Sequence, residues 1–223
     1  MRWPKIERTG WKLHKRLSRA AQRGEDRPVR RLQTLLRRSP DAKRRAGRQV
    51  TQATRGKKTP GVEGLAALTP VERRTLAEHL PLDGNAAPVR RVYIPKPGPR
   101  AQRPWGMPTI ADRATPGVGT HALEPAWEAQ FEPHREGVRP GRSTWDAIGA
   151  LEVQLNQQPP WGLDADLATG VDCSNHAALL RPLDAQPTLN RQLNAWRKAG
   201  VWDKGDWHPT ETGTPPGGPV APF

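Results

Sequence analysis

The sequence predicts an α+β protein in which basic helices precede a region of mixed helices and short strands. Three observations support this class. Residues 1–60 place apolar side chains at helical spacing among many arginines and lysines. Residues 89–95 and 103–110 each read as a strand, and together they are typical of a hairpin. Residues 163–167 alternate apolar side chains with two aspartates, which predicts a further short strand.

The net charge of +14 is concentrated at the N-terminus. Residues 1–60 contain 20 Lys and Arg against 4 Asp and Glu, whereas the remaining residues contain 16 against 18. This asymmetry is typical of a nucleic-acid-binding arm, and the alternative is a solvated basic tail without a partner. Leu, Ile, Val and Phe number 38 of 223 residues, so we expect a marginal core in which tryptophans supply much of the burial.

The sequence argues against a disulfide-stabilised protein and against a membrane-spanning one. The single cysteine, Cys173, cannot form an internal disulfide. No apolar run is long enough to cross a membrane and no secretory signal is present, so we predict a cytoplasmic protein with no membrane partner.

The cationic N-terminal region predicts three amphipathic helices. The first spans about residues 10–24 and stops at Gly24, the second spans 27–38, and the third begins at Pro40 after a Ser39 cap. A loop follows at 56–64. The cations of these segments are candidates for RNA phosphate contacts. The candidates are Lys12, Arg16, Arg19, Arg23, Arg44, Arg48, Lys57 and Lys58.

Further along, Thr69 with Glu72 has the pattern of a capping box, which predicts another short helix. Residues 114–120 contain one proline and two glycines. Within a helix these would cost about 3 kcal/mol for the proline and about 1 kcal/mol for each glycine, so we expect the next helix to begin only near His121. Later helices are expected at 146–157, 175–183 and 188–200.

Two features near the end of the chain leave alternatives open. A strand ending in Asp166, with Asp172 beyond the turn, suits a divalent metal held by oxygen ligands, or else it is the solvent face of an edge strand. Trp196, Trp202 and Trp207 form either a platform on which bases stack or, as we prefer, a core patch.

Five segments taken in order are more specific than any one alone. In their order and intervals, the chain resembles the reverse transcriptase/maturase encoded by bacterial group II introns, over nearly the whole length from about residue 11. The five segments are 89–96, 103–113, 122–128, 137–143 and the Gly-Thr-Pro-Pro-Gly-Gly sequence at 213–218, and they flank the strand predicted at 163–167.

This resemblance implies an RNA-directed DNA polymerase with a right-hand fold, part of a mobile genetic element. Residues 1–64 would be a basic helical N-terminal extension, and residues 65–223 the fingers and part of the palm. Asp166 matches the first catalytic aspartate, and the backbone of Leu167 would add a carbonyl ligand for Mg²⁺. The positions implied to contact nucleotide or template are Arg91, Lys96, Arg103, Arg113, Val171 and Pro216.

The chain also departs from the family. Val171 stands where the family has an aromatic residue, and Pro216 stands where it has a glutamine. No Asp-Asp dipeptide occurs in residues 1–223, so the Tyr-x-Asp-Asp hairpin is absent from them.

We therefore expect a truncated, divergent fragment with a weak or incomplete Mg²⁺ site, inactive alone, that binds group II intron RNA and also template RNA or DNA. One alternative is a non-catalytic RNA-binding accessory protein derived from the fingers. Another is an active polymerase completed by a second copy or by a separately encoded second half.

Overall fold

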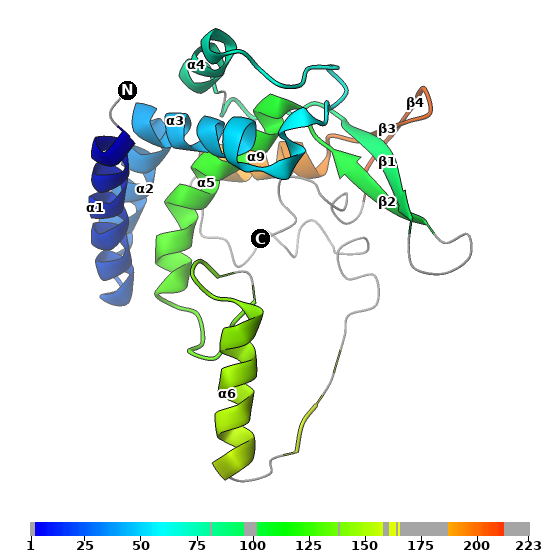
Figure 1. The fold of residues 1–223 in the computed structure, drawn as a ribbon. Helices are drawn as coiled ribbons and strands as arrows, with labels where there is room; N and C mark the ends of the chain where they lie inside the picture. The colour runs from blue at the N-terminus through cyan, green and yellow to red at the C-terminus, as the bar shows by residue number, and fades with distance from the viewer. Residues whose placement is uncertain are drawn as a thin grey trace.

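The computed structural model describes residues 3–80, 82–95, 102–137, 139–157, 161–163, 165 and 187–211. Three N-terminal helices lie against a long central helix, a small sheet lies toward the other end of that helix, and one further helix projects away from the rest (Figure 1). Mixed helix and strand content was predicted and is confirmed.

The N-terminal helices are α1 (Trp3–Gln22), α2 (Asp26–Arg38) and α3 (Pro40–Arg48). The first begins a full two turns earlier than predicted, because Ile6 extends its buried stripe toward the N-terminus. Gly24 follows its end with a φ of 66°, the left-handed geometry that glycine adopts readily. Ser39 Oγ accepts a hydrogen bond from the Ala42 amide at 3.4 Å, which confirms the predicted cap of α3.

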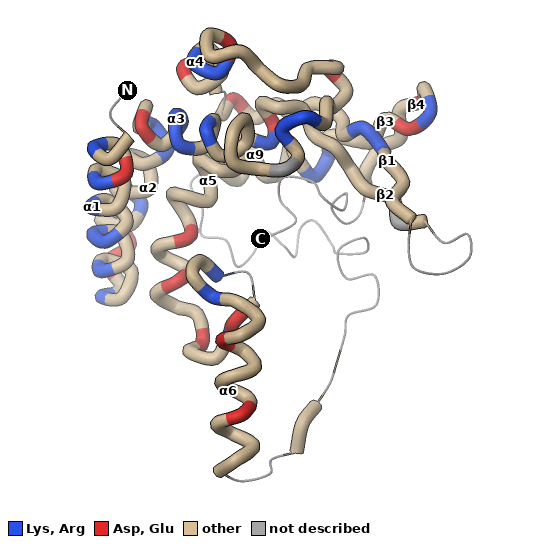
Figure 2. Tube along the Cα trace, in the orientation of Figure 1, with Lys and Arg blue, Asp and Glu red and all other residues tan. Residues whose placement is uncertain are grey.

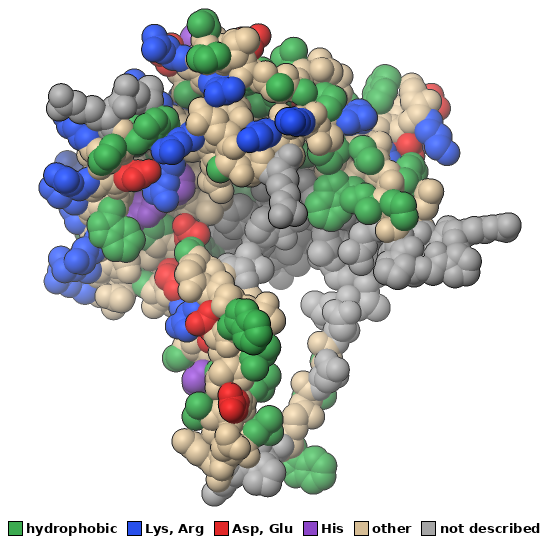
Figure 3. Space-filling model, in the orientation of Figure 1, with side chains coloured by type: hydrophobic (Ala, Val, Ile, Leu, Met, Phe, Trp, Pro, Cys, Tyr) green, Lys and Arg blue, Asp and Glu red, His purple; other side chains and the backbone are tan. Residues whose placement is uncertain are grey.

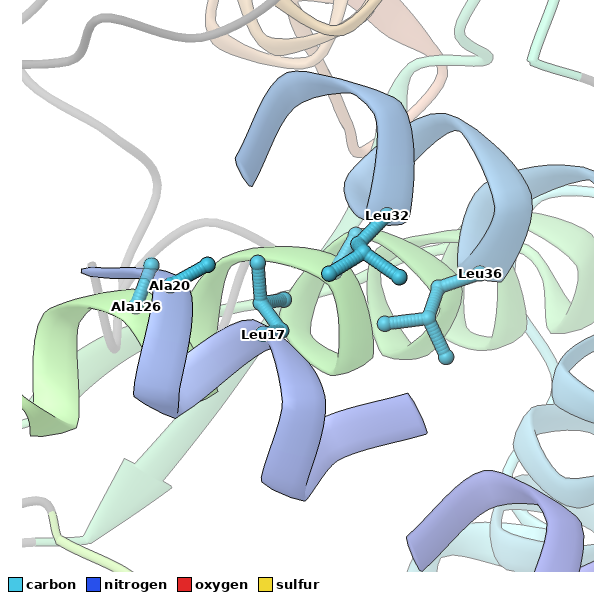
Figure 4. Close-up of a cluster of buried hydrophobic side chains, with 6 residues drawn as sticks. Leu17, Ala20, Leu32, Leu36 and Ala126 are labelled. Atoms are coloured by element: carbon cyan, nitrogen blue, oxygen red, sulfur yellow. The ribbon is translucent and has the colours of Figure 1, made fainter. Parts of the chain in front are cut away.

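A buried cluster joins α1 and α2 to the central helix α5 (Ile110–Glu128) (Figure 4). Leu17 and Leu36 are 0% and 1% exposed and lie against α5. The full cluster is Leu17, Ala20, Leu32, Leu36, Ala122 and Ala126. The basic helices are therefore fastened to the rest of the protein by an ordinary apolar core.

Helix α5 corrects the prediction that residues 114–120 are not helical. It begins at Ile110, where Thr109 Oγ accepts a hydrogen bond from the Asp112 amide at 3.1 Å. Ala114 and Val118 are fully buried against α3 and the segment after α4, so burial offsets the low helix propensity of the proline and glycines. Gly117 also permits close approach, because a Cβ there would lie 3.2 Å from the Cβ of Ala46 in α3.

The sheet has the strand order β2-β1-β3-β4. Strands β1 (Val89–Pro95) and β2 (Gln102–Met107) form the predicted antiparallel hairpin. The second strand ends at Met107 rather than at residue 110, because Thr109 already caps α5. Strands β3 (Val201–Asp203) and β4 (Asp206–His208) were not predicted; β3 joins β1 in parallel.

The remaining described elements are short. The π-helix η1 (Gln49–Ala53) and the 3-10 helix η2 (Arg55–Lys58) continue from α3, so the start of the predicted 56–64 loop is a helical turn. Helix α4 (Pro70–Glu78) has the predicted capping box. Helix α6 (Thr144–Gln157) and helix α9 (Pro187–Arg197) lie close to the predicted positions. The helix predicted at 175–183 lies outside the described residues.

Two predictions concern the C-terminal half. Of the strand predicted at 163–167, Leu163 and Ala165 lie in irregular structure and are exposed, and the other three residues lie outside the described residues. The tryptophan patch is corrected in part. Trp196 is core at 3% exposed, but Trp202 and Trp207 are 44% and 50% exposed on β3 and β4 rather than buried.

Candidate nucleic-acid interface

The predicted cations of α1 form one exposed stripe. Lys12, Arg16 and Arg19 of α1 and Arg23 just after its end recur every three or four residues and are all exposed, on the flank beside the buried Leu17 and Ala20. The stripe runs for about 16 Å along the helix. Lys and Arg residues recur along α1 and α3 in Figure 2, and Figure 3 shows their side chains over the same part of the molecule. This surface can contact several phosphates of one nucleic-acid strand.

The cations predicted on α3 are partly exposed, and each also contacts a neighbouring side chain. Arg44 pairs with Asp41 at 3.0 Å, and its side chain is 35% exposed. Arg48 lies 3.6 Å from a carboxylate oxygen of Glu7, and its guanidinium carbon is 4.4 Å from the centroid of the Trp3 ring. Each exposed pair is a weak interaction that a phosphate can replace.

The loop after α3 is fastened to the hairpin and to α5. Arg113 donates from Nη1 to the Gly56 carbonyl and from Nη2 to the Thr59 carbonyl, both at 2.8 Å. Arg90 donates to the Pro60 carbonyl at 2.8 and 3.1 Å. Glu63 accepts the Ile110 amide at 2.8 Å at the start of α5. These bonds fix a loop that belongs to the N-terminal region against the strands.

The two lysines predicted to bind RNA in this loop differ in their contacts. Lys57 donates from Nζ to the Gln52 carbonyl at 2.9 Å. Lys58 is exposed. The loop therefore presents Lys58 to solvent, while Lys57 also steadies its own turn.

The residues predicted to contact nucleotide are not gathered at one point. Arg113 is directed at the loop carbonyls, as described above. Arg91 is half-buried on β1, beside Tyr93 on the strand face opposite Arg90. The backbone of Arg103 pairs with Ile94, and its side chain lies outside the described residues. Also outside the described residues are Lys96, Asp166, Leu167, Val171 and Pro216.

The structure adds cations that sequence reasoning missed. Arg73 and Arg74 of α4 line a pocket together with the α3 arginines and Trp3. In the sequence these two arginines are visible as a pair one turn inside a capped helix. The neighbouring residues, however, do not indicate that this turn of the helix faces α3. The missed residues enlarge the cationic surface from α1 across to α4.

A buried polar cluster lies beneath the cationic helices. The imidazole rings of His14 on α1 and His121 on α5 have centroids 5.6 Å apart. Neither ring nitrogen of His121 has a hydrogen-bond partner among the residues that the structure describes. Burial, followed by the positive charges of Arg45 and His14, lowers the pKa of His121 to about 3. Burial likewise raises the pKa of nearby Glu124. The cluster favours uncharged side chains at this helix interface.

Two searches of the described residues give negative results. No three His, Cys, Asp or Glu side chains within the described ranges are arranged to share a metal ion. In the same part of the chain, no helix is both long enough and apolar enough to span a bilayer.

Comparison with known proteins identifies two matching family models. The N-terminal domain of reverse transcriptase matches residues 1–80, and reverse transcriptase (RNA-dependent DNA polymerase) matches residues 94–223. Protein YkfC of Escherichia coli (strain K12) is 34% identical over 212 residues, covering 88% of this chain and 55% of that protein. Group II intron-encoded protein LtrA of Lactococcus lactis subsp. cremoris is 29% identical over 139 residues, covering 61% of this chain and 23% of that protein. The chain thus spans about half of the first relative and about a quarter of the second.

Proposed function

Because this chain belongs to the reverse transcriptase family, we propose that it is the RNA-binding N-terminal part of a group II intron reverse transcriptase. In this proposal residues 1–64 are the extension that grips intron RNA, and residues 65–223 are the fingers and part of the palm of a right-hand polymerase. Support comes from the two family matches and from the similarity to an intron-encoded protein.

The observation that carries the proposal is the cationic surface of α1 and α3. Its exposed cations stand on helices whose opposite faces are buried against α5, so they are held in fixed positions rather than on a loose tail. The loop after α3 is bonded to Arg113 and to Arg90, and so RNA held by the helices is kept beside the hairpin. Template RNA or DNA is the second expected partner, since the hairpin carries Arg91.

For catalysis, we propose that Asp166 and the backbone of Leu167 hold Mg²⁺, the ion that reverse transcriptases generally use. A carboxylate and a carbonyl are suitable ligand types for this ion. Two-metal transfer also needs carboxylates on the opposite side of the metal pair, and residues 1–223 contain no Tyr-x-Asp-Asp sequence. The 223-residue chain by itself is therefore expected not to extend a primer.

One observation favours a polymerase with further parts over a stand-alone accessory protein. Every residue of α6 is exposed or only half-buried, including Trp145 at 80%, Ile148 at 49% and Leu155 at 58%. These side chains recur at helical spacing and form an apolar stripe, which Figure 3 shows as green on the projecting helix. We propose that a segment equivalent to the rest of the relatives covers this stripe.

The experiment that tests RNA binding compares two triple variants of the chain. The first replaces Arg16, Arg19 and Arg23 by glutamine. The second replaces three exposed cations away from α1: Arg135, Lys198 and Lys204. Affinity for a group II intron RNA is measured from 50 to 200 mM salt. Each phosphate contact contributes about 0.7 to 0.9 to the slope of log affinity against log salt.

The α1 variant should lower that slope by about 2 to 3 relative to the wild-type chain, and the second variant should leave it nearly unchanged. Equal slopes for the two variants would contradict binding by α1. Primer extension on an RNA template with Mg²⁺ tests the catalytic part, with Asp166→Ala as control. Extension by the wild-type chain that disappears in the control would overturn the proposed inactivity.

A further inference from the structure

A small basic pocket lies between α3 and α4. Its volume is about 170 Å³, and Arg44 and Arg48 of α3 face Arg73 and Arg74 of α4 across it. Trp3, at the start of α1, also lines it. Gly47 of α3 lies against Ala77 of α4, and a Cβ at Gly47 would make only an ordinary contact with the Cβ of Ala77 at 3.6 Å. Small residues thus lie where the two helices meet.

The arginines keep most of their hydrogen-bonding capacity. Arg44 uses one nitrogen on Asp41, and Arg73 uses Nε on the Leu68 carbonyl at 2.8 Å. Among the described residues, Arg74 has no ion pair or hydrogen bond. Each guanidinium has five N–H donors in a planar fork that matches phosphate oxygens. Glu78 also lines the pocket, and Asp41 and Glu7 pair with Arg44 and Arg48 beside it, so four guanidinium groups meet three carboxylates and the local charge still favours an anion.

The size of the pocket limits the ligand. A water molecule needs about 10–15 Å³ of such volume, so 170 Å³ accepts a group of several heavy atoms. Pockets for whole drug-sized ligands and cofactors measure about 300–1,000 Å³. One phosphate with part of its nucleoside fits this range. The Arg48 guanidinium, whose carbon lies 4.4 Å from the centroid of the Trp3 ring, is itself a planar group on which an unpaired base can stack.

We propose that this pocket binds one phosphate and the adjoining base of an unpaired nucleotide in the bound RNA. The inference rests on the proposed function and specifies the form of RNA recognised. A regular duplex displays its phosphates on a convex surface, which the exposed stripe of α1 can contact. A concave site among four arginines instead requires a nucleotide that leaves the regular helix and turns its backbone inward.

A double-mutant cycle across the pocket tests this proposal. The variants are Arg44→Gln, Arg74→Gln and the double variant, which remove one cation from each wall. The control cycle combines Arg74→Gln with Arg19→Gln, because Arg19 lies on the α1 stripe outside the pocket. The probes are a twelve-nucleotide single-stranded RNA and a twelve-base-pair RNA duplex, with binding followed by fluorescence anisotropy. Circular dichroism confirms that each variant is folded.

Two side chains that grip the same phosphate are coupled, whereas distant ones act independently. We expect each single pocket variant to lose about tenfold in affinity for the single strand. This loss is at the lower end of the range for removing a hydrogen bond to a charged group. The Arg44–Arg74 double variant should lose clearly less affinity than the product of the two single fold-losses. The control double variant, Arg74→Gln with Arg19→Gln, should lose the full product of its two single fold-losses. The duplex should respond to Arg74→Gln no more than to Arg19→Gln.

Each result separates this inference from the proposed function. Independent losses for Arg44 and Arg74, or equal losses for single strand and duplex, would overturn the pocket proposal while leaving RNA binding intact. Failure of the wild-type chain to bind either RNA would overturn the proposed function and this inference with it.

Discussion

Two glycines in α5 offer a matched test of how closely α3 packs on the central helix. Replacing either Gly117 or Gly119 by alanine should gain about 1 kcal/mol from helix propensity and a less flexible unfolded chain. The surroundings differ. A Cβ at Gly119 would meet only the Cδ1 of Leu189 at 3.4 Å, an ordinary contact with the end of a flexible side chain. A Cβ at Gly117 would lie 3.2 Å from the Cβ and 3.6 Å from the Cα of Ala46.

The contact at Gly117 has no easy relief, because the Ala46 methyl is attached directly to the backbone and is 1% exposed. Helix α3 would have to move as a whole, and overpacking of this kind costs about 1–3 kcal/mol. We therefore expect Gly119→Ala to raise the free energy of unfolding by about 1 kcal/mol, and Gly117→Ala to leave it unchanged or lower it by up to about 2 kcal/mol. Urea unfolding followed by circular dichroism measures both. Equal stabilisation by the two substitutions would refute the close α3–α5 contact.

Two further predictions concern His121 and Arg113. The low pKa of His121 means that the unfolded chain takes up a proton that the native state excludes once the pH falls below 6.5, so stability is lost toward acid. Between pH 6.5 and 5 the free energy of unfolding should fall by about 2 kcal/mol. His121→Phe should remove that loss, whereas the control His134→Gln, at an exposed position, should keep it. Identical pH profiles of stability for His121→Phe and the wild-type chain would contradict the prediction. Arg113→Met should lose about 3 kcal/mol of stability and speed trypsin cleavage within the 56–59 loop. The control is Arg91→Met, because Arg91 lies on the face of β1 that points away from the Arg90 side chain. Equal cleavage rates in the two variants would contradict the role of Arg113 in holding the loop.

Features set by neighbouring residues could be predicted from the sequence. Ser39 and Thr69 cap α3 and α4 as expected, because each bonds an amide only three residues away. The alternation in residues 89–95 likewise identified a strand of the hairpin. The cationic candidates on α1 and α3 were also found, since their spacing against the apolar stripe is visible in the sequence.

Features that depend on contacts distant in the chain could not be predicted. The helix at 114–120 exists because Ala114 and Val118 are buried against distant segments, and no propensity scale contains that contact. Strand β3 forms because it pairs with β1, more than a hundred residues earlier. The role of Arg113 was also hidden, because the carbonyls that it binds belong to a loop more than fifty residues away.

The sequence by itself determined the family, the uneven distribution of charge and the caps of α3 and α4, because motif order, composition and capping depend on residues close together in the chain. Only the tertiary structure decided which arginines face one another. Arg44 and Arg74 share a pocket because α3 packs on α4 with Gly47 against Ala77, and such packing depends on side-chain volumes across two helices.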